Sequence, residues 1–270
     1  MTKVGIIGSG NMGGAIAKGI LRQNVISDSE FMISGIDQTE LDRFTNDLPD
    51  HNFEVTTDNC KLAKSVEVII LAIKPIVFSK VLNEIKNSIT PETVLVSIAA
   101  GVSIKDIEEQ IGFPVKVVRA MPNVPLLVNC GMTALCQNSL VTEQNLELVN
   151  SIFNGCGLVE HTGEYLMDAV TAVSGSSPAY VFMFIEAMAD GAVLEGIPRP
   201  TAYRMAAQSV MGAAKMVLDL ELHPAVLKDM VTSPGGTTIE AVAKLEQGGL
   251  RSTVIEAMRS CAQKSREMNG

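Results

Sequence analysis

The order of short apolar runs in the first 163 residues constrains the fold more than any other feature of the sequence. Between most of these runs lie stretches with apolar residues at helical spacing, such as Met12–Arg22 and Ile76–Asn87. Runs that are apolar on both faces are typical of strands buried between two layers of helices. The pattern therefore predicts βαβ units around a parallel sheet. The strands expected are Val4–Ile7, Phe31–Ile36, Val66–Ile73, Thr93–Ile98 and Val115–Ala120, with Gly131–Cys136 and Leu158–His161 as further candidates.

The texture of the sequence changes after Gly163. Alanine and methionine become frequent, and 9 of the 14 methionines lie between Tyr165 and Gly270. Apolar residues recur at helical spacing, and prolines separate the segments. We therefore expect an α/β domain over residues 1–163 and an all-helical domain over residues 164–270. Because methionine and alanine stripes of this kind pack in cores or between subunits, we also expect the helical domain to form a homodimer.

Charge and composition exclude several classes of partner. The formal net charge is −9, and the basic residues are scattered singly, so no nucleic-acid partner is expected. The five cysteines include no CxxC pair, and the three histidines are isolated, which predicts reduced thiols and no metal site. We find no apolar run approaching 18 residues and no targeting segment before the first strand, so we expect a cytoplasmic protein without a membrane partner.

The first predicted strand runs directly into a glycine-rich turn. Its sequence, Gly8-Ser9-Gly10-Asn11-Met12-Gly13, fits G-x-G-x-x-G and precedes a predicted helix. In this context the three glycines allow a tight turn, a close approach of the backbone to a pyrophosphate, and close packing of helix on sheet. The pyrophosphate lies at the helix N-terminus, where N–H groups have no partner within the helix. The sequence thus predicts a Rossmann-type dinucleotide-binding domain.

The choice between NADPH and NADH depends on where the second strand ends. If the strand ends near Ile33, Ser34 and Gly35 meet the adenosine ribose and leave room for a 2′-phosphate. If it runs to Ile36, Asp37 favours NADH, because an acid at this place holds the ribose 2′-hydroxyl. Asp37 could instead cap the following helix, with Glu40 three residues on. We expect NADPH and leave NADH open.

Two segments in the helical half are suited to a small anion. In the first, Ser174–Tyr180, a serine precedes Pro178, which is a signal for the start of a helix after a loop. In the second, Ser233–Glu240, two glycines leave backbone N–H groups accessible, and Thr237 with Glu240 matches a capping box. A nest of N–H groups at a helix N-terminus favours a carboxylate. Neither segment offers an evident general acid. A cyclic imine, unlike a carbonyl, carries its proton beforehand and needs none.

The chain resembles pyrroline-5-carboxylate reductase over essentially its whole length. The run Asp229–Ala241 resembles the signature of that family and is highly specific. Supporting matches are Ala72–Pro75, Ala99–Gly101, Met121–Asn123 and Gly175–Tyr180, and Gly8–Gly13 also fits. The resemblance implies the last step of proline biosynthesis, in which L-1-pyrroline-5-carboxylate is reduced to L-proline by hydride transfer to the imine carbon. It also implies a helical domain interleaved between two subunits, with dimers often assembled into rings.

The resemblance further implies roles for individual residues. Thr238 is the expected catalytic residue and hydrogen-bonds the imine nitrogen. Substrate binding is expected of Ser233, Gly236, Thr237, Thr238, Ser176 and Glu221. Cofactor binding is expected of Gly8, Ser9, Gly10, Asn11, Met12, Gly13, Ser34, Asn59, Ala72, Lys74, Pro75 and Asn123. Many members are more polar or basic after the second strand than Ser34–Gln38, which leaves the cofactor preference open.

Two other functions are consistent with parts of the sequence. A two-domain β-hydroxyacid dehydrogenase needs a catalytic lysine on the helix after a glycine-rich loop, and Pro178–Phe184 contains none. A nucleotide-sensing module would bind NAD(P)H without turnover, and such a sensor needs no carboxylate nest at Ser233–Thr238. The reductase is the function that uses all of the motifs.

Overall fold

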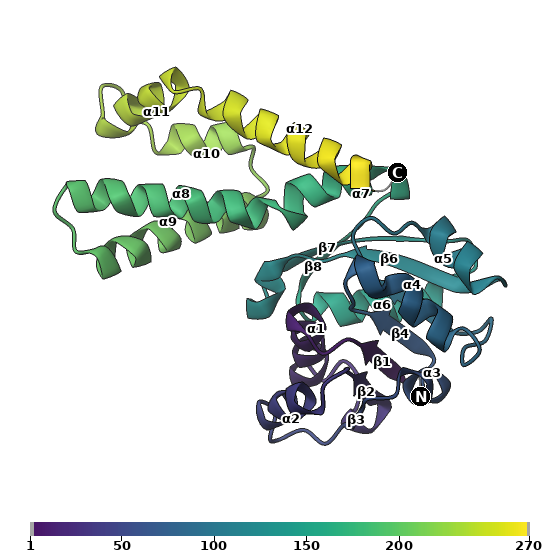
Figure 1. Cartoon of the computed structure of the whole chain (residues 1–270). Helices are drawn as coiled ribbons and strands as arrows, with labels where there is room; N and C mark the ends of the chain where they lie inside the picture. The colour runs from purple at the N-terminus through teal and green to yellow at the C-terminus, as the bar shows by residue number, and fades with distance from the viewer. Residues whose placement is uncertain (1–2, 269–270) are drawn as a thin grey trace. The chain divides into compact units, whose positions relative to one another are not determined.

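A single eight-stranded sheet organises the first part of the chain in the computed structural model, which describes residues 3–268 (Figure 1). The strand order is β3-β2-β1-β4-β5-β6-β7-β8, and the pairings from β3 through β6 in this order are all parallel. The order 3-2-1-4-5-6 is that of a Rossmann domain. The strands are β1 (Val4–Ile7), β2 (Phe31–Ser34), β3 (Glu54–Thr56), β4 (Val68–Leu71), β5 (Val94–Ser97), β6 (Lys116–Met121), β7 (Gly131–Gln137) and β8 (Gly157–His161).

Helices cover both faces of this sheet and explain why its strands are apolar throughout. On one face, strand residues such as Val4 and Ile6 pack with α1 (Asn11–Arg22), α2 (Gln38–Asn46) and α6 (Glu143–Asn154). On the other face, Ile7 and its neighbours pack with α3 (Asn59–Ser65), α4 (Pro75–Ile85) and α5 (Ile104–Ile111). Residues of one strand alternate between the two cores, as strand geometry requires. The predicted three-layer α/β domain is confirmed.

The edges of the sheet differ from the sequence-based expectation in two places. β3 was not predicted, because Glu54–Thr56 is short and is not buried. β7 runs antiparallel to β6 after the 3-10 turn η2 (Val124–Val128), and β8 is then parallel to β7. Periodicity alone does not distinguish a parallel from an antiparallel addition at an edge.

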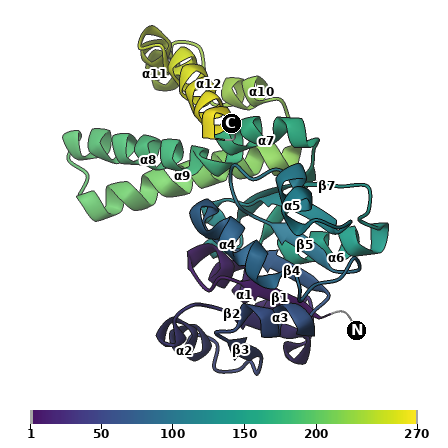
Figure 2. The ribbon, with the colours of Figure 1, turned by 45° about the vertical axis from the view of Figure 1, so that its right-hand side comes forward.

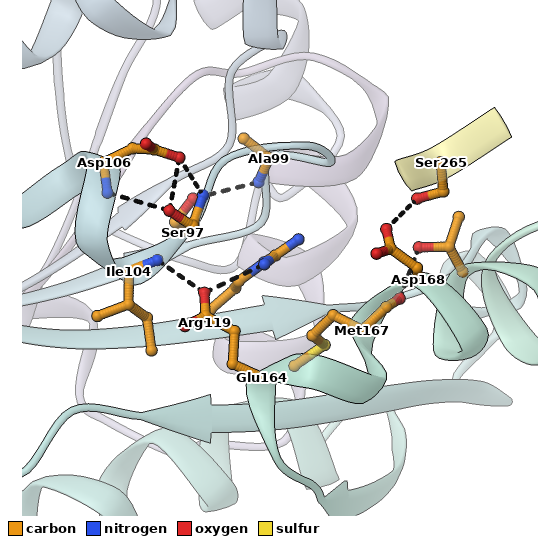
Figure 3. A network of polar contacts seen from close by, with 11 residues as sticks. Ser97, Ala99, Ile104, Asp106, Arg119, Glu164, Met167, Asp168 and Ser265 are labelled. Carbon is orange, nitrogen blue, oxygen red and sulfur yellow. Dashed lines mark hydrogen bonds and ion pairs between the residues drawn. The ribbon is translucent and has the colours of Figure 1, made fainter. Parts of the chain in front are cut away.

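An ion pair between a buried arginine and a half-buried glutamate fixes the segment that follows β8. Arg119 on β6 is 5% exposed, and its Nη1 lies 3.2 Å from Oε1 of Glu164, in the 3-10 turn η3 (Glu164–Leu166). The same oxygen accepts the backbone N–H of Ile104 at 2.7 Å (Figure 3). One carboxylate therefore joins the sheet and the first turn of α5 to the segment leading into α7 (Met167–Val170).

The C-terminal end of the last helix is hydrogen-bonded to α7. The Ser265 hydroxyl on α12 (Leu250–Met268) donates to Oδ1 of Asp168 at 2.6 Å (Figure 3). By their contacts, the residues divide into one compact unit that runs to Gly175 and resumes at Cys261, and a second unit of Ser176–Ser260. We call them the sheet unit and the helical unit. The domain limits expected at 163 and 164 stay a prediction about separate folding.

Long helices make up the helical unit. α8 (Ser177–Leu194) and α9 (Arg199–Leu220) run side by side, as Figures 1 and 2 both show. α10 (Pro224–Met230), α11 (Thr237–Gln247) and most of α12 complete it. Within Ser176–Ser260, all of which the structure describes, the buried residues are three alanines: Ala189, Ala202 and Ala206.

Large apolar side chains of the helical unit point outward. Phe182, Met183, Met205 and Met211 are each more than half exposed. Among the described residues, one helical stretch, Glu164–Leu194, also meets a length-and-hydropathy criterion for crossing a membrane, although apolar helices of non-membrane proteins meet it too. Surfaces this apolar mark sites of protein or membrane contact, so this unit needs a further surface to cover it.

Candidate functional site

The turn after β1 has the shape that a phosphate-binding loop requires. Gly8 has φ of +112°, and a Cβ built there lies 2.3 Å from the carbonyl oxygen of Ala72. A Cβ on Gly13 lies 1.9 Å from the carbonyl oxygen of Gly8. Neither position therefore tolerates a side chain, for the two reasons predicted: a tight turn and close packing of helix on sheet.

The space above Gly10 is open, in contrast to the space around Gly8 and Gly13. A Cβ on Gly10 has no heavy atom within 4 Å. Gly10 is also the N-cap of α1, and no side chain caps that helix. The first N–H groups of α1 thus face an open place without side-chain acceptors, which suits an anion at the positive end of the helix dipole. The loop fits the pyrophosphate of a dinucleotide.

β2 ends at Ser34, close to the first of the two ends considered, and the expectation that Ser34 and Gly35 meet the ribose stays a prediction. Ser34 is buried, and its hydroxyl donates to Oδ1 of Asn59 at 2.8 Å. Asn59 in turn reaches Oε2 of Glu84 on α4 with Nδ2, at 3.3 Å. Asp37 is the N-cap of α2 and accepts the N–H of Thr39 at 2.8 Å, as the capping interpretation predicted. The structure thus brings Ser34 and Asn59 together and leaves Asp37 exposed beside them.

One contact at this place was missed in the sequence. A Cβ on Gly35 lies 2.3 Å from the Ser9 hydroxyl oxygen, so the turn after β1 packs directly on the backbone that follows β2. The signal was present, since a glycine directly after a buried strand often marks a close backbone approach. The expectation for Gly35 from the sequence is only that it leaves room for a 2′-phosphate.

The remaining predicted cofactor residues follow β4 and β6. Ala72 is bonded through its N–H to Ile7 O at 2.9 Å, which places it beside the end of β1. Lys74 is the exposed N-cap of α4, and Pro75 is the first residue of that helix. Asn123 follows β6 and is 8% exposed. All of these residues lie at the carboxyl ends of parallel strands, where open α/β sheets bind ligands.

Two hollows border the sheet at opposite ends. A pocket of about 400 Å³ opens beside the phosphate loop, lined in part by Ser9–Asn11, Lys18 and Arg43. A larger groove of about 1160 Å³ lies at the N-terminal ends of the strands, where Thr93 and Lys116 belong to its lining. Its size does not make it the cofactor site, because it borders the wrong ends of the strands.

The anion nest predicted in the helical half has a different cap from the one expected. α11 begins at Thr237 with Gly236 as N-cap, and no side chain caps the helix. The predicted capping box of Thr237 and Glu240 is therefore wrong, because Thr237 is already the first helical residue. The correction leaves the N–H groups of the first turn without a side-chain acceptor. The Ser233 hydroxyl oxygen lies over Gly236, 2.4 Å from where its Cβ would be.

The other predicted anion segment is not a loop. Thr171–Gly175 forms a π-helix between α7 and α8, and α8 follows with Ser176 as N-cap and Pro178 near its start. The interpretation of Ser174 as part of a loop is wrong, because the wider turn carries the chain continuously toward the next helix. Glu221 is the C-cap residue of α9, with a left-handed φ of +52°, and it is exposed, so its expected substrate contact stays a prediction.

Thiols contribute no metal site to this arrangement. No group of three or more potential ligands from His, Cys, Asp and Glu is found among residues 3–268. Burial raises the pKa of the Cys156 thiol to about 11. Burial and, to a smaller extent, the charge of Glu164 raise the pKa of Cys136 to about 11 as well. Cys130, in contrast, is exposed.

Two family models match the chain. Residues 164–268 match the model described as pyrroline-5-carboxylate reductase dimerisation. Residues 3–101 match the model described as NADP oxidoreductase coenzyme F420-dependent. The second of these covers the phosphate loop and the strands around it.

Relatives match from end to end. The pyrroline-5-carboxylate reductase of Escherichia coli (strain K12) is 45% identical over 267 residues, which cover 99% of this chain and 98% of that protein. The enzyme of the same name from Arabidopsis thaliana is 38% identical, covering 99% and 95%.

Solved structures agree with these relatives. The Plasmodium falciparum pyrroline carboxylate reductase with NADP bound superposes with a TM-score of 0.87 at 34% identity, covering 100% of this chain and 98% of that one. The pyrroline-5-carboxylate reductase of Coxiella burnetii gives a TM-score of 0.92 at 33% identity, covering 100% and 99%.

Proposed function

The chain belongs to the pyrroline-5-carboxylate reductase family, and from this membership we propose how its own residues carry out the reaction. It is an oxidoreductase that reduces L-1-pyrroline-5-carboxylate to L-proline with NAD(P)H. NADPH is the expected reductant, and NADH is also possible. The observation that carries this conclusion is the likeness to reductases of this name over 98% or more of the chain, in sequence and in structure.

The cofactor is proposed to lie along the carboxyl edge of the sheet. The N–H groups of Gly10–Gly13 hold its pyrophosphate, because α1 begins there without a side-chain cap. Ser34 and Asn59 lie at the adenosine ribose, and Ala72, Lys74 and Pro75 lie toward the nicotinamide. The open space above Gly10 and the hydrogen bond between Ser34 and Asn59 support this assignment.

The substrate carboxylate is proposed to lie on the first turn of α11. The N–H groups of Thr237 and Thr238 lie in the first turn of a helix that has no side-chain cap, and the Ser233 hydroxyl lies over Gly236. The Gly236 N–H itself donates to the carbonyl oxygen of Ser233 at 3.1 Å. The helix dipole adds a positive potential at this end. Ser176 and Glu221, at the ends of other helices of this unit, are proposed as further substrate contacts.

The chemistry demands little of the protein beyond positioning. When bound, the reduced nicotinamide would supply a hydride to the imine carbon, and the ring nitrogen would keep its proton and become a secondary amine. The Thr238 hydroxyl can donate to or accept from that nitrogen and so orient the ring. No general acid is required, because the iminium form already carries the proton.

The two alternative functions do not fit this family. α8 contains no lysine over Ser177–Leu194, so the dehydrogenase lysine is absent where it was sought. A sensor without turnover leaves the uncapped first turn of α11 without a purpose.

Assembly and location follow from the same membership. The chain self-associates through its dimerisation domain. We propose in addition that dimers form rings, that the protein works in the cytoplasm, and that neither a membrane nor nucleic acid is a partner. The outward apolar side chains of α8 and α9 support the assembly, and the net charge of −9 supports the absence of a nucleic-acid partner.

The proposal is tested by oxidation of NADPH and of NADH, followed by absorbance, with pyrroline-5-carboxylate as substrate. We expect rapid oxidation with the wild-type protein. Absence of oxidation with both cofactors, in protein that binds NADPH, would leave the proposed reaction without support.

Thr238→Ala tests the proposed catalytic residue in the same assay. Loss of one hydrogen bond to the reacting ring should cost about 1–3 kcal/mol in kcat/KM, with the affinity for NADPH unchanged. Thr238→Ser keeps the hydroxyl and serves as the matched control, so it should retain most of the activity. An alanine variant as active as the serine variant removes Thr238 from the mechanism.

A further inference from the structure

Asn123 has both ends of its amide committed to backbone groups. Its Oδ1 accepts the N–H of Met132 at 2.9 Å, and its Nδ2 donates to the carbonyl oxygen of Ser174 at 3.0 Å. Because an N–H can only donate and a carbonyl can only accept, these partners fix the orientation of the amide. Asn123 is also the N-cap residue of η2, yet its side chain makes no capping bond there. The side chain is therefore used for tertiary contacts.

Ser174 needs the donor that Asn123 provides. In a regular helix its carbonyl would accept the N–H of the residue four positions on, which is Pro178 and has no N–H. The chain meets this break with the π-helix Thr171–Gly175, and Asn123 supplies a hydrogen bond from outside the helix. A buried carbonyl without a partner would cost about 1–3 kcal/mol, so this bond has a structural reason to persist.

The position of this bond in the chain gives it further significance. Ser174 and Gly175 are the last residues of the sheet unit before the chain enters the helical unit at Ser176. Asn123 itself joins the end of β6 to the start of β7 through Met132. One amide thus ties the carboxyl end of the sheet to the final turn of chain before a proposed substrate contact.

We propose that Asn123 is a positioning residue for hydride transfer, acting through Ser174 rather than by touching the cofactor. The inference rests on the proposed function, in which Ser176 contacts the imine that receives the hydride. Hydride transfer needs donor and acceptor carbons held at close range. Greater mobility of the turn before Ser176 therefore lowers the rate of that step. It leaves cofactor binding intact.

Asn138 offers a matched control. It lies just beyond the other end of β7, and its amide is likewise committed: Oδ1 accepts from Val117 N–H, and Nδ2 donates to Glu108 and to Val115 O. It is half-buried in the same unit and far along the strand from Ser174. Replacing its donor by an oxygen removes two hydrogen bonds and sets a second carboxylate beside Glu108, so this control is at least as disruptive locally, without reaching the π-helix.

The experiment compares Asn123→Asp with Asn138→Asp. Aspartate keeps the acceptor for Met132 and replaces the donor to Ser174 by an oxygen. We expect Asn123→Asp to lower kcat at least tenfold, to keep the Kd for NADPH within twofold, and to raise the primary deuterium isotope effect with C4-deuterated NADPH. Asn138→Asp should keep kcat and the isotope effect within twofold of wild type.

Amide hydrogen exchange separates this inference from the proposed function. In Asn123→Asp, without substrate, residues 171–177 should exchange faster than in wild type, and in Asn138→Asp they should not. Equal kcat for the two variants, unchanged exchange at 171–177, or a large loss of NADPH affinity in Asn123→Asp would each overturn the inference. Wild-type protein that turns over no imine would instead overturn the proposed function, with the exchange result still deciding the contact.

Discussion

Gly10 and Gly13 lie in one loop, but the structure gives them different physical reasons to lack a side chain. A Cβ on Gly13 collides with the Gly8 carbonyl, whereas a Cβ on Gly10 meets open space. The fold therefore requires a glycine at position 13, whereas the glycine at position 10 leaves space for a ligand that approaches the loop.

This difference predicts opposite effects of two substitutions. Gly10→Val should leave the melting temperature within about 3 °C of wild type and raise the Kd for NADPH at least tenfold, because the branched side chain fills the open place. Gly13→Ala should lower the melting temperature clearly, because backbone atoms must move. Scanning calorimetry and fluorescence titration measure the two quantities. Wild-type NADPH affinity in Gly10→Val contradicts the proposed pyrophosphate site.

Asp37 is the residue that bears on cofactor preference. Its carboxylate caps α2 beside the end of β2, near the proposed place of the 2′-phosphate. Like charges at close range repel by about 1 kcal/mol or more even in water, so Asp37→Ser should raise the ratio of kcat/KM for NADPH to that for NADH by about fivefold or more. Asp42→Asn removes a charge one turn further along the same helix and is the control. An equal ratio in both variants would exclude Asp37 as a determinant.

At the scale of elements, α5 is held by its first turn. The Ser103 hydroxyl accepts the N–H of Asp106, and Asp106 accepts from the Ser103 N–H and hydroxyl. The next residue, Ile104, donates its N–H to Glu164, whose carboxylate also forms the ion pair with Arg119 (Figure 3). The capping box and the segment after β8 are therefore both hydrogen-bonded at the N-terminal end of α5.

The cap predicts a pH dependence of stability. The hydrogen bonds from the Ser103 side chain and backbone lower the pKa of Asp106 from its ordinary value of 3.8, against the smaller opposing effect of burial. A lowered pKa in the folded state means that the stabilisation is complete above pH 3.8 and is lost as the pH falls through the folded-state pKa. Asp106→Asn should thus cost about 1 kcal/mol in the free energy of unfolding at pH 7, and less near pH 3.

Urea unfolding at the two pH values measures this difference. Glu109→Gln, on the same helix and in an exposed ion pair with Lys105, is the control and should have little effect at either pH. A constant cost of Asp106→Asn from pH 7 to pH 3 would show that the carboxylate is not the stabilising group.

At the scale of the whole molecule, the helical unit lacks a core of its own within one chain. Its buried residues are alanines, while Phe182 and Met183 on α8 are 60% and 69% exposed. Large apolar side chains contribute most to stability when they are removed from water, so a second copy is the natural cover for them.

The self-associated state should therefore determine stability. We expect analytical ultracentrifugation to find no monomer at micromolar concentration, and the melting temperature to rise with protein concentration. Met183→Asp should shift the population toward monomer and lower the melting temperature. Leu140→Asp, at an exposed apolar position of the sheet unit, should leave the mass unchanged. A stable monomer with an intact helical unit would contradict the expectation.

Local patterns in the sequence are sufficient to predict the sheet, the phosphate loop and the helical character of the second half. Five buried strands, G-x-G-x-x-G after the first, and a change to alanine and methionine are local patterns, and local patterns follow from strand and helix periodicity. The same patterns do not show whether β2 ends near Ile33 or at Ile36, because the apolar residues of this run continue to Ile36. β3 was missed because a short exposed edge strand has no apolar pattern.

Contacts between segments that are distant in the chain determine which polar groups hydrogen-bond to one another. Thr237 and Glu240 fit a capping box in sequence, but the helix starts at Thr237 and leaves its first turn uncapped. The sequence predicts a loop at Ser174, whereas the structure has a π-helix, where Pro178 removes a donor and Asn123 supplies another from 51 residues away in the chain. A hydrogen bond between distant segments depends on how the sheet brings them together, and no local pattern contains that information.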